Sequence, residues 1–418
     1  MTHRIIVIGA GLAGLSAAYE LVRAGYEVQV FEARERVGGR VYTVQLNAGQ
    51  YGDLGAEFVD DNHTAVMAYA DEFDLKLDPA CRFPDDLYWL IDSVLCNRKS
   101  LTTEQSQALD DLYDKLTALG EHSSLQTLEQ WLQTHQIAAF ASWLARLQAR
   151  SLFAANSESI GVGFYASFSG ANGSNMRIRG GSSRLVDALA ERLEQRVCTG
   201  TPIRRIQQTQ DTVTLGVETL SGLVEVVADS VIVAVPWSVL RNIPLDIPLT
   251  DIQREAIFKL PYGGVVKTLL QYPDRFWSQP NFGIVLLDGE YQAIWEPTFA
   301  QPGTTKILSC FSGGTQSLRL GQRAIDIGRQ VVSTVYPHAL EAIASVSYDW
   351  NGDRWARGAY CYFGPGQLER FHPHLALSAG RVFFAGEHTA PVEYSGYMEG
   401  AIRSGQRAAQ QVAKLATS

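Results

Sequence analysis

The sequence predicts an α/β protein in which a parallel-sheet domain is interleaved with a second domain of mixed sheet plus helices. Three observations lead to this fold class. The first 40 residues alternate a buried strand, a glycine turn, a helix and a second strand. Two later runs, VIVAVP at 231–236 and GRVFFAG at 380–386, also read as buried strands. The intervening stretches combine helical spacing with further strands such as YQAIWEP and KILSCFS.

Length, charge and cysteine usage exclude several classes of protein. A chain of 418 residues exceeds one simple core, so two domains are expected. The net charge of −9 argues against a nucleic-acid partner, which usually needs a basic face. The five cysteines form no C-x-x-C pair, so we expect no metal site, no disulfide framework and a cytoplasmic location. The first strand begins near Ile5 and no long apolar run follows, so neither a signal peptide nor a membrane anchor is expected.

The N-terminal block RIIVIGAGLAGLSAAYELVRAGYEVQVFEARERVGGR has the pattern of a Rossmann-like dinucleotide-binding unit. A strand at Arg4–Ile8 runs into three glycines and a helix, and a second strand at Glu27–Phe31 ends in an acid. The glycines permit a tight turn, backbone approach to a pyrophosphate and close helix packing, and the acid accepts hydrogen bonds from a ribose hydroxyl. The positions expected to contact the dinucleotide are Gly9, Gly11, Ala13, Gly14 and Glu32.

The segments that follow make the expectation more specific. EARERVGGR and then YGDLGAEFV resemble the second cofactor motif and the flavin-ring segment of the FAD-dependent amine oxidase superfamily, flavin monoamine and polyamine oxidases among them. In motif detail the chain is most similar to polyamine oxidases. The resemblance implies contacts to FAD from Ala33, Arg34, Gly39, Arg40, Gly55, Ala56 and Glu57.

Two further blocks extend the resemblance along the chain. In MRIRGGSSRLVDALAERLEQRV a glycine pair opens an amphipathic helix, and the strand after it carries Ile203, where the family holds adenine by backbone contacts. In GRVFFAGEHTAPVEYSGYMEG a strand and then a helix N-terminus are implied to approach the flavin, whose reduced form carries negative charge. The implied contacts in this block are Gly386, Glu387, Gly396, Tyr397 and Met398.

These blocks divide the chain into two interleaved parts, as the amine oxidase fold implies. We expect residues 1–75, 179–254 and 353–418 to form a discontinuous FAD-binding domain. Residues 76–178 and 255–352 are expected to form the substrate-binding domain of mixed sheet and helices. Within it, LTTEQSQALDDLYDKLTALGEH predicts a helix whose first turn is capped by Thr102 or Thr103.

The stretch GGVVKTLLQY reads as an apolar strand with Lys267 in its middle. A lysine is rarely buried without a partner, so the strand has either a wet face or a polar group inside. The resemblance favours the second interpretation, because the family carries a lysine on such a strand that reaches a water at flavin N5. It also implies an aromatic cage for the amine, formed by Tyr360 in RGAYCYFGPG and Tyr397 in SGYMEG.

The covalent state of the flavin follows from the same alignment. Mitochondrial monoamine oxidases have a cysteine bound to FAD immediately before the first cage aromatic. Ala359 stands there in this chain, and Cys361 lies on the other side of Tyr360. We therefore expect FAD to be bound without a covalent link.

The acidic segment GAEFVDDNH bears on the substrate. L-amino-acid oxidases place an arginine there, whereas this chain offers carboxylates, and the polyamine oxidase motif puts its acid at Asp60. Glu296 is a second candidate for binding an ammonium group. The resemblance implies hydride transfer from a polyamine such as spermine or spermidine, imine hydrolysis to an aldehyde, and reoxidation by O2 to H2O2. Three alternatives remain: an L-amino-acid oxidase using an arginine such as Arg82, a carotenoid- or porphyrinogen-type FAD desaturase, and a non-enzymatic FAD-binding protein.

Overall fold

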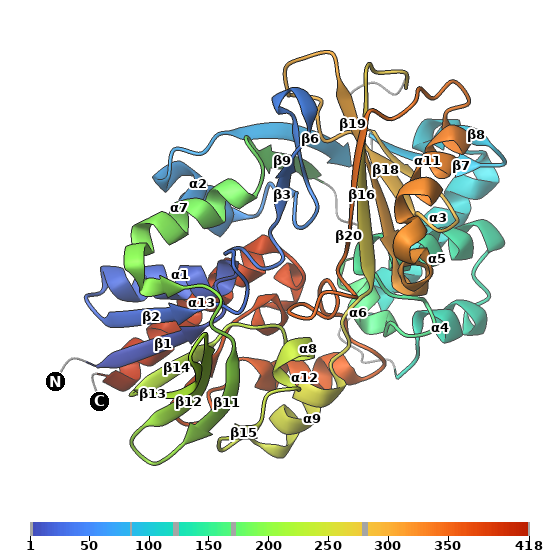
Figure 1. The fold of residues 1–418 in the computed structure, drawn as a ribbon. Helices are drawn as coiled ribbons and strands as arrows, with labels where there is room; N and C mark the ends of the chain where they lie inside the picture. Colours follow the sequence, from blue (N-terminus) through green and yellow to red (C-terminus); the bar gives the residue numbers. More distant parts are fainter. Residues whose placement is uncertain (1–2, 84–85, 120–124, 169–172, 278–282, 417–418) are drawn as a thin grey trace.

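The computed structural model describes residues 3–416 apart from four internal segments, 84–85, 120–124, 169–172 and 278–282. The side chains of 81–83 and 173–174 also lie outside the description, so the side chain of Arg82 is not placed. Two large sheets occupy opposite sides of the molecule, and the first strand and the last helix lie together on one side (Figure 1).

The first sheet is wholly parallel, as its buried apolar strands predict. Its strands run in the order β10 (Val197–Cys198), β2 (Glu27–Phe31), β1 (Arg4–Ile8), β14 (Ser230–Val233) and β21 (Val382–Phe384). The helices around it are α1 (Leu12–Arg23), α7 (Ser183–Leu193) and α13 (Met398–Ala416). Helices α1 and α13 pack in direct contact, because a Cβ on Gly405 would lie 2.3 Å from the carbonyl oxygen of Ala13. The predicted strand–helix–strand unit at the N-terminus is confirmed.

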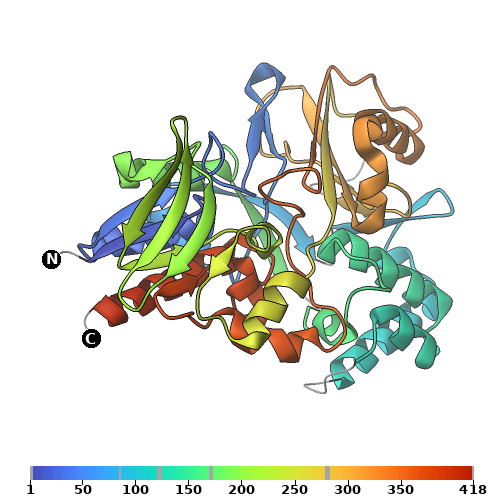
Figure 2. The same cartoon turned by 60° about the horizontal axis from the view of Figure 1, so that its bottom comes forward.

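A four-stranded sheet lies beside the parallel sheet, as Figure 2 shows. It runs in the order β13 (Gly222–Ala228), β12 (Val213–Thr219), β11 (Ile203–Gln208) and β15 (Leu245–Asp246). Ile203, the predicted adenine contact, begins β11 and is buried.

The second large sheet is mixed and holds the strand that carries Lys267. Its order is β20 (Ala344–Asp349), β16 (Val265–Tyr272), β19 (Lys306–Gly313), β18 (Ala293–Trp295), β17 (Ile284–Leu286), β7 (Leu87–Ile91) and β8 (Val94–Asn97). Strand β16 has an antiparallel neighbour on each side, and every one of its residues is buried. The predicted strand is confirmed. Of the two interpretations of Lys267, a solvent-facing lysine is excluded, because the whole of β16 is buried. The five strands of the first sheet come from residues 1–75, 179–254 and 353–418, and all seven of this sheet come from 76–178 and 255–352. The domain division along these bounds stays a prediction.

Two small sheets and the remaining helices complete the described part of the fold. The strands are β3 (Thr43–Gln45) with β4 (Tyr51–Asp53), and β5 (Val59–Asp60), β9 (Gly173–Ile178) and β6 (Leu77–Phe83). The other helices are α2 (Thr64–Glu72), α3 (Thr103–Ala118), α4 (Leu128–Thr134), α5 (Ala139–Phe153), α6 (Val162–Ala166), α8 (Trp237–Leu240), α9 (Asp251–Lys259), α10 (Ser317–Leu320), α11 (Ala324–Val335) and α12 (Gln367–Leu375). The cap of α3 is Thr102, whose hydroxyl accepts the N–H of Gln105 at 3.2 Å.

Candidate active site

The turn between β1 and α1 is built for close backbone approach. Gly9 has a φ of +100°, which favours glycine, and a Cβ on Gly14 would lie 1.9 Å from the Gly9 carbonyl oxygen. Nothing lies within 4 Å of the Cβ position of Gly11, so open space borders this turn. Helix α1 begins after Gly11 without a side-chain cap, which leaves its first N–H groups for a ligand. This geometry suits an anionic group such as a pyrophosphate.

Glu32, at the end of β2, lies beside the glycine turn. Its carboxylate accepts hydrogen bonds from the N–H groups of Ala10 and Arg34, each at 2.8 Å. Burial raises the pKa of Glu32, while these two N–H groups act in the opposite direction. Gly39 packs against the glycine turn, since its Cβ position is 3.5 Å from the Cα of Gly11. Ala13 is buried in α1 and Ala33 follows Glu32, half-buried.

Arginines of the same loop bind acids from the C-terminal segment. Arg34 donates two hydrogen bonds to Asp353, at 2.7 and 2.8 Å. Arg40 donates to Glu387 at 2.8 Å. Arg36, which the motif analysis did not single out, lies over the Tyr42 ring with its Cζ 4.2 Å from the centroid. The first and third blocks of the sequence therefore meet through charge pairs.

Glu387 is the centre of a buried cluster. Its carboxylate accepts hydrogen bonds from Arg40, from the Gly396 N–H at 3.1 Å and from the Cys361 thiol at 3.2 Å. Burial acts to raise the pKa of Glu387, but the charges of Arg40 and His388 and the hydrogen bonds from Arg40 and Cys361 together outweigh it and hold the pKa below its ordinary value. Burial also raises the pKa of Cys361 well above its ordinary value, and the Glu387 charge adds to this. Cys361 is therefore a protonated thiol turned toward Glu387.

Lys267 is 3% exposed and its ammonium is paired inside the protein. Its Nζ lies 2.5 Å from Glu57 Oε2 and 3.3 Å from the Gly55 carbonyl oxygen. The Trp295 ring covers it, with the centroid 4.9 Å from Nζ. The backbone at Gly55 and Ala56 runs along Arg40 and Tyr42, so the predicted lysine and the predicted flavin-ring segment are brought together.

Glu57 joins this lysine to two residues that the sequence did not indicate. Arg177 Nε donates to Glu57 at 2.7 Å, and Trp295 Nε1 donates to the same oxygen at 2.9 Å. Burial acts to raise the pKa of Glu57, but the charges of Lys267 and Arg177 outweigh it and lower the pKa. No signal within the motifs identified Arg177, because the contact spans 120 residues.

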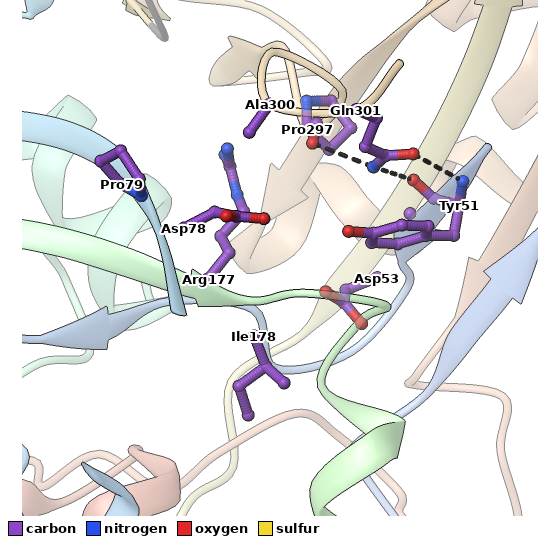
Figure 3. Close-up of a pocket in the computed structure, with 10 residues that line it drawn as sticks. Tyr51, Asp53, Asp78, Pro79, Arg177, Ile178, Pro297, Ala300 and Gln301 are labelled. Atoms are coloured by element: carbon purple, nitrogen blue, oxygen red, sulfur yellow. Dashed lines mark hydrogen bonds between the residues drawn. The ribbon is translucent and has the colours of Figure 1, made fainter. Parts of the chain in front are cut away.

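Arg177 also lines a small pocket behind this cluster, together with Asp53, Tyr51, Asp78 and Gln301 (Figure 3). Gln301 closes the pocket wall by exchanging two hydrogen bonds with the Tyr51 backbone, at 2.9 and 3.0 Å. Asp53 is 4% exposed. Burial is the main cause that raises its pKa to about 7, and the charge of Glu57 adds to it. A carboxyl group that titrates near neutrality thus borders the lysine cluster.

Of the two tyrosines predicted to form the cage, Tyr360 packs against Gly396, the residue before Tyr397: the Cβ position of Gly396 is 3.4 Å from the Tyr360 ring. The Tyr360 hydroxyl donates to the Leu152 carbonyl at 2.8 Å. Tyr397 meets the His63 ring edge-on, with centroids 5.0 Å apart. Burial raises the pKa of both tyrosines, so both are neutral phenols. Met398 is buried at the start of α13, and Gly386 has a φ of +138°.

Asp60 comes from the N-terminal part of the chain and lies in the same region as Tyr397. Its carboxylate accepts a hydrogen bond from Asn175, and its Oδ2 is 3.6 Å from His63 Nε2. His63 contacts both groups, Asp60 through its Nε2 and Tyr397 through its ring edge. The Asp60 side chain keeps 29% of its surface exposed, and burial of the rest raises its pKa.

Glu296, by contrast, is occupied by protein groups. Its carboxylate accepts hydrogen bonds from Trp277 Nε1 at 2.8 Å and from Arg275 Nε at 3.0 Å, and it is 3% exposed. These contacts favour a structural role for Glu296 over the predicted binding of an ammonium group. The described residues contain no group of three His, Cys, Asp or Glu side chains arranged for a metal ion. In the same ranges, no helix is long and apolar enough to cross a membrane.

Comparison with known proteins places this geometry in context. The family described as flavin-containing amine oxidoreductases matches residues 12–413. A flavin-containing amine oxidase of Oncorhynchus mykiss is 29% identical over 98% of this chain and 86% of its own length. The flavin-containing amine oxidase B of Homo sapiens is 28% identical over 98% and 85%.

Solved structures show the same fold. A putrescine oxidase with putrescine bound superposes with a TM-score of 0.86 at 22% identity, covering 99% of both chains. The cyclohexylamine oxidase of Brevibacterium oxydans IH-35A gives a TM-score of 0.85 at 23% identity, covering 100% of both. At these identities the likeness concerns the fold alone.

Proposed function

The chain belongs to the flavin-containing amine oxidoreductase family, and from this membership we propose that it oxidises an amine carrying a second positive charge, using FAD held without a covalent bond. Bound FAD supplies the two-electron acceptor for the hydrogen on the carbon beside the amine nitrogen, and O2 accepts the electrons in turn. The protein's own residues bind, orient and neutralise charge around that reaction. A polyamine such as spermine or spermidine is the proposed substrate.

The residues present fit FAD. Open space beside Gly11 and the uncapped start of α1 suit the pyrophosphate, and the Glu32 carboxylate suits a ribose hydroxyl. The absence of a covalent link is supported by Ala359, which has no nucleophile, and by Cys361, whose buried thiol already donates to Glu387. A thiol with a raised pKa is also a poor nucleophile.

The neutral phenol rings of Tyr360 and Tyr397 would hold the amine. Their π faces attract the positive charge that develops on nitrogen, and their burial excludes water from the reacting carbon. One N–H of the Lys267 ammonium remains for a water molecule, since Glu57 and Gly55 accept the other two. The product imine would leave this dry site to be hydrolysed to an aldehyde.

The single observation that carries the substrate proposal is Asp60. This carboxylate is linked to Tyr397, the predicted cage residue, through the ring of His63 and keeps part of its surface exposed, so a distal ammonium can reach it. An amino-acid substrate would need a guanidinium for its carboxylate, yet the buried Arg177 already donates to Glu57. A desaturase of large apolar substrates would gain nothing from a carboxylate at this position.

The test compares Asp60→Ala on spermidine and on a simple alkyl monoamine at fixed ionic strength. Loss of a charge-assisted hydrogen bond worth roughly 1.5–3 kcal/mol predicts about a 10- to 150-fold fall in kcat/KM for the triamine. The fall should appear mainly in KM, because the contact is remote from the reacting carbon. Asp61→Asn, on the exposed neighbour, is the control. Equal losses of kcat/KM on both amines would mean that Asp60 does not bind the second ammonium group.

A further inference from the structure

The buried ammonium of Lys267 is held in one position from several directions. Its strand β16 is fixed by antiparallel neighbours, with Phe311 opposite on β19 and Tyr348 opposite on β20. The side chain is 4% exposed, so water does not solvate it freely. A buried charge of this kind persists only when a partner compensates for its lost hydration.

Glu57 is that partner, and its own orientation is fixed. Arg177 on β9 and Trp295 on β18 both donate to Oε1, which leaves Oε2 for Lys267 on β16. Three strands of two sheets therefore set the direction of one carboxylate. Glu57 cannot swing away from Lys267 without breaking its hydrogen bonds with Arg177 Nε and Trp295 Nε1.

The donors of the ammonium group can be counted. A protonated lysine has three N–H groups. Among the described residues, the hydrogen-bond acceptors at Nζ are Glu57 Oε2 and the Gly55 carbonyl, which leaves one N–H for a molecule that the chain does not supply. The Glu57 carboxylate lies 2.5 Å from Nζ, so the two side chains form a buried salt bridge.

The other charged groups around Glu57 do not take its place as the partner of Lys267. Arg177 is a second cation on the same carboxylate, and Asp53 on β4 is the remaining acid that acts on the pair. Asp53 is itself hydrogen-bonded to Thr43 and to the Ser182 N–H, which direct its oxygens elsewhere. Removal of the Glu57 charge would leave two buried cations facing each other.

We propose that Glu57 is a positioning residue for the amine oxidation: it holds the Lys267 ammonium in place and leaves one of its N–H groups for a water molecule or flavin at this site. The identity of the reaction rests on the proposed function. The physical coupling between Glu57 and Lys267 does not, and it is measured separately below.

The experiment is a double-mutant cycle of Glu57→Gln and Lys267→Met on the FAD-loaded protein, read in both rate and thermal unfolding. In rate, Glu57→Gln lowers turnover about 10-fold, less than the roughly 10²-fold loss expected for Lys267→Met. The loss falls on kcat and leaves KM within about twofold, because the ion pair positions a group at the reacting atoms and does not bind the amine. In the Lys267→Met background, Glu57→Gln changes the rate less than about twofold.

In thermal unfolding, Lys267→Met lowers Tm by leaving Glu57 with one cation, and adding Glu57→Gln restores part of the loss. Glu129→Gln is the matched control, because Glu129 pairs with Arg146 at 2.7 Å without touching a lysine. Trp295→Phe, which removes one donor to Glu57, should lower kcat by less, with KM again unchanged, and serves if Glu57→Gln does not fold.

Additive effects in rate, or a loss that falls on KM instead of kcat, would overturn the proposal, as would additive effects in Tm. If no amine is oxidised at all, the proposed function fails while the Tm cycle still decides whether Glu57 and Lys267 act as a unit.

Discussion

Replacing Asp53 with Asn should change how the stability of the protein depends on pH. Asp53 is buried beside Glu57, and its pKa of about 7 stands about three units above the ordinary 3.8. Between these values the folded protein keeps a proton that the unfolded chain has released. The free energy of unfolding therefore falls as pH rises through this window, and at roughly 1.4 kcal/mol per unit the total loss is about 4 kcal/mol. Asparagine cannot ionise and escapes this loss.

The assay is urea unfolding of the FAD-saturated protein at pH 5 and pH 8.5. At pH 5, about one unit above the ordinary value, the wild type has already lost roughly 1.5 kcal/mol, so Asp53→Asn should be the more stable protein by at most about that amount; its amide oxygen can still accept from Thr43 and from the Ser182 N–H. At pH 8.5 this advantage should grow to about 4 kcal/mol. Asp78→Asn, in the same pocket but paired with Arg179, is the control and should bring no such gain. An Asp53→Asn variant with the wild-type pH dependence would refute the reasoning.

Three further changes test the site. Acid precipitation should release the yellow flavin into the supernatant, because Cys361 is committed to Glu387; colour retained in the pellet would contradict non-covalent binding. Lys267→Met should keep FAD bound, judged by its absorbance after gel filtration, but slow flavin reduction or reoxidation by about 10²-fold, and unchanged half-reactions would remove the lysine from the chemistry. Tyr397→Ala should lower kcat/KM for every amine by about 10-fold or more while FAD stays bound, since one face of the cage is lost; a wild-type kcat/KM would argue against the cage.

The parts of the fold that depend on local spacing could be predicted from the sequence. The glycine turn after β1, the helix α1 and the acid Glu32 follow from one unit of about 30 residues, and the cap of α3 at Thr102 follows from a four-residue pattern. The apolar, β-branched run around Lys267 was enough to place it on a strand.

The partner of Lys267 could not be predicted in the same way. Glu57 lies 210 residues from it in sequence, and Arg177 and Trp295 come from two other strands. The sequence pattern of a strand indicates which residues share a face. It does not indicate that both faces of β16 are buried, because this depends on the segments that pack against them. Glu57 was accordingly assigned to the cofactor on its motif, and its contact with the lysine emerged only from the assembled sheets.

For Glu296 the sequence suggested a contact with a ligand, whereas the structure shows contacts with protein groups. An acid next to a tryptophan in a substrate domain suggested an ammonium site, but Arg275 and Trp277 satisfy it within the same region of the chain. The sequence offers no way to decide whether an acid faces a ligand or an arginine until both are placed in space.

The most direct test of the amine oxidase account is anaerobic mixing of the FAD-loaded protein with spermidine, putrescine, a monoamine and an L-amino acid, followed by admission of O2. The account predicts that amines bleach the flavin absorbance, spermidine most efficiently, and that O2 restores the colour with one H2O2 per flavin. A flavin that dithionite bleaches but none of the amines does would contradict it, and bleaching by the amino acid alone would replace the proposed substrate class.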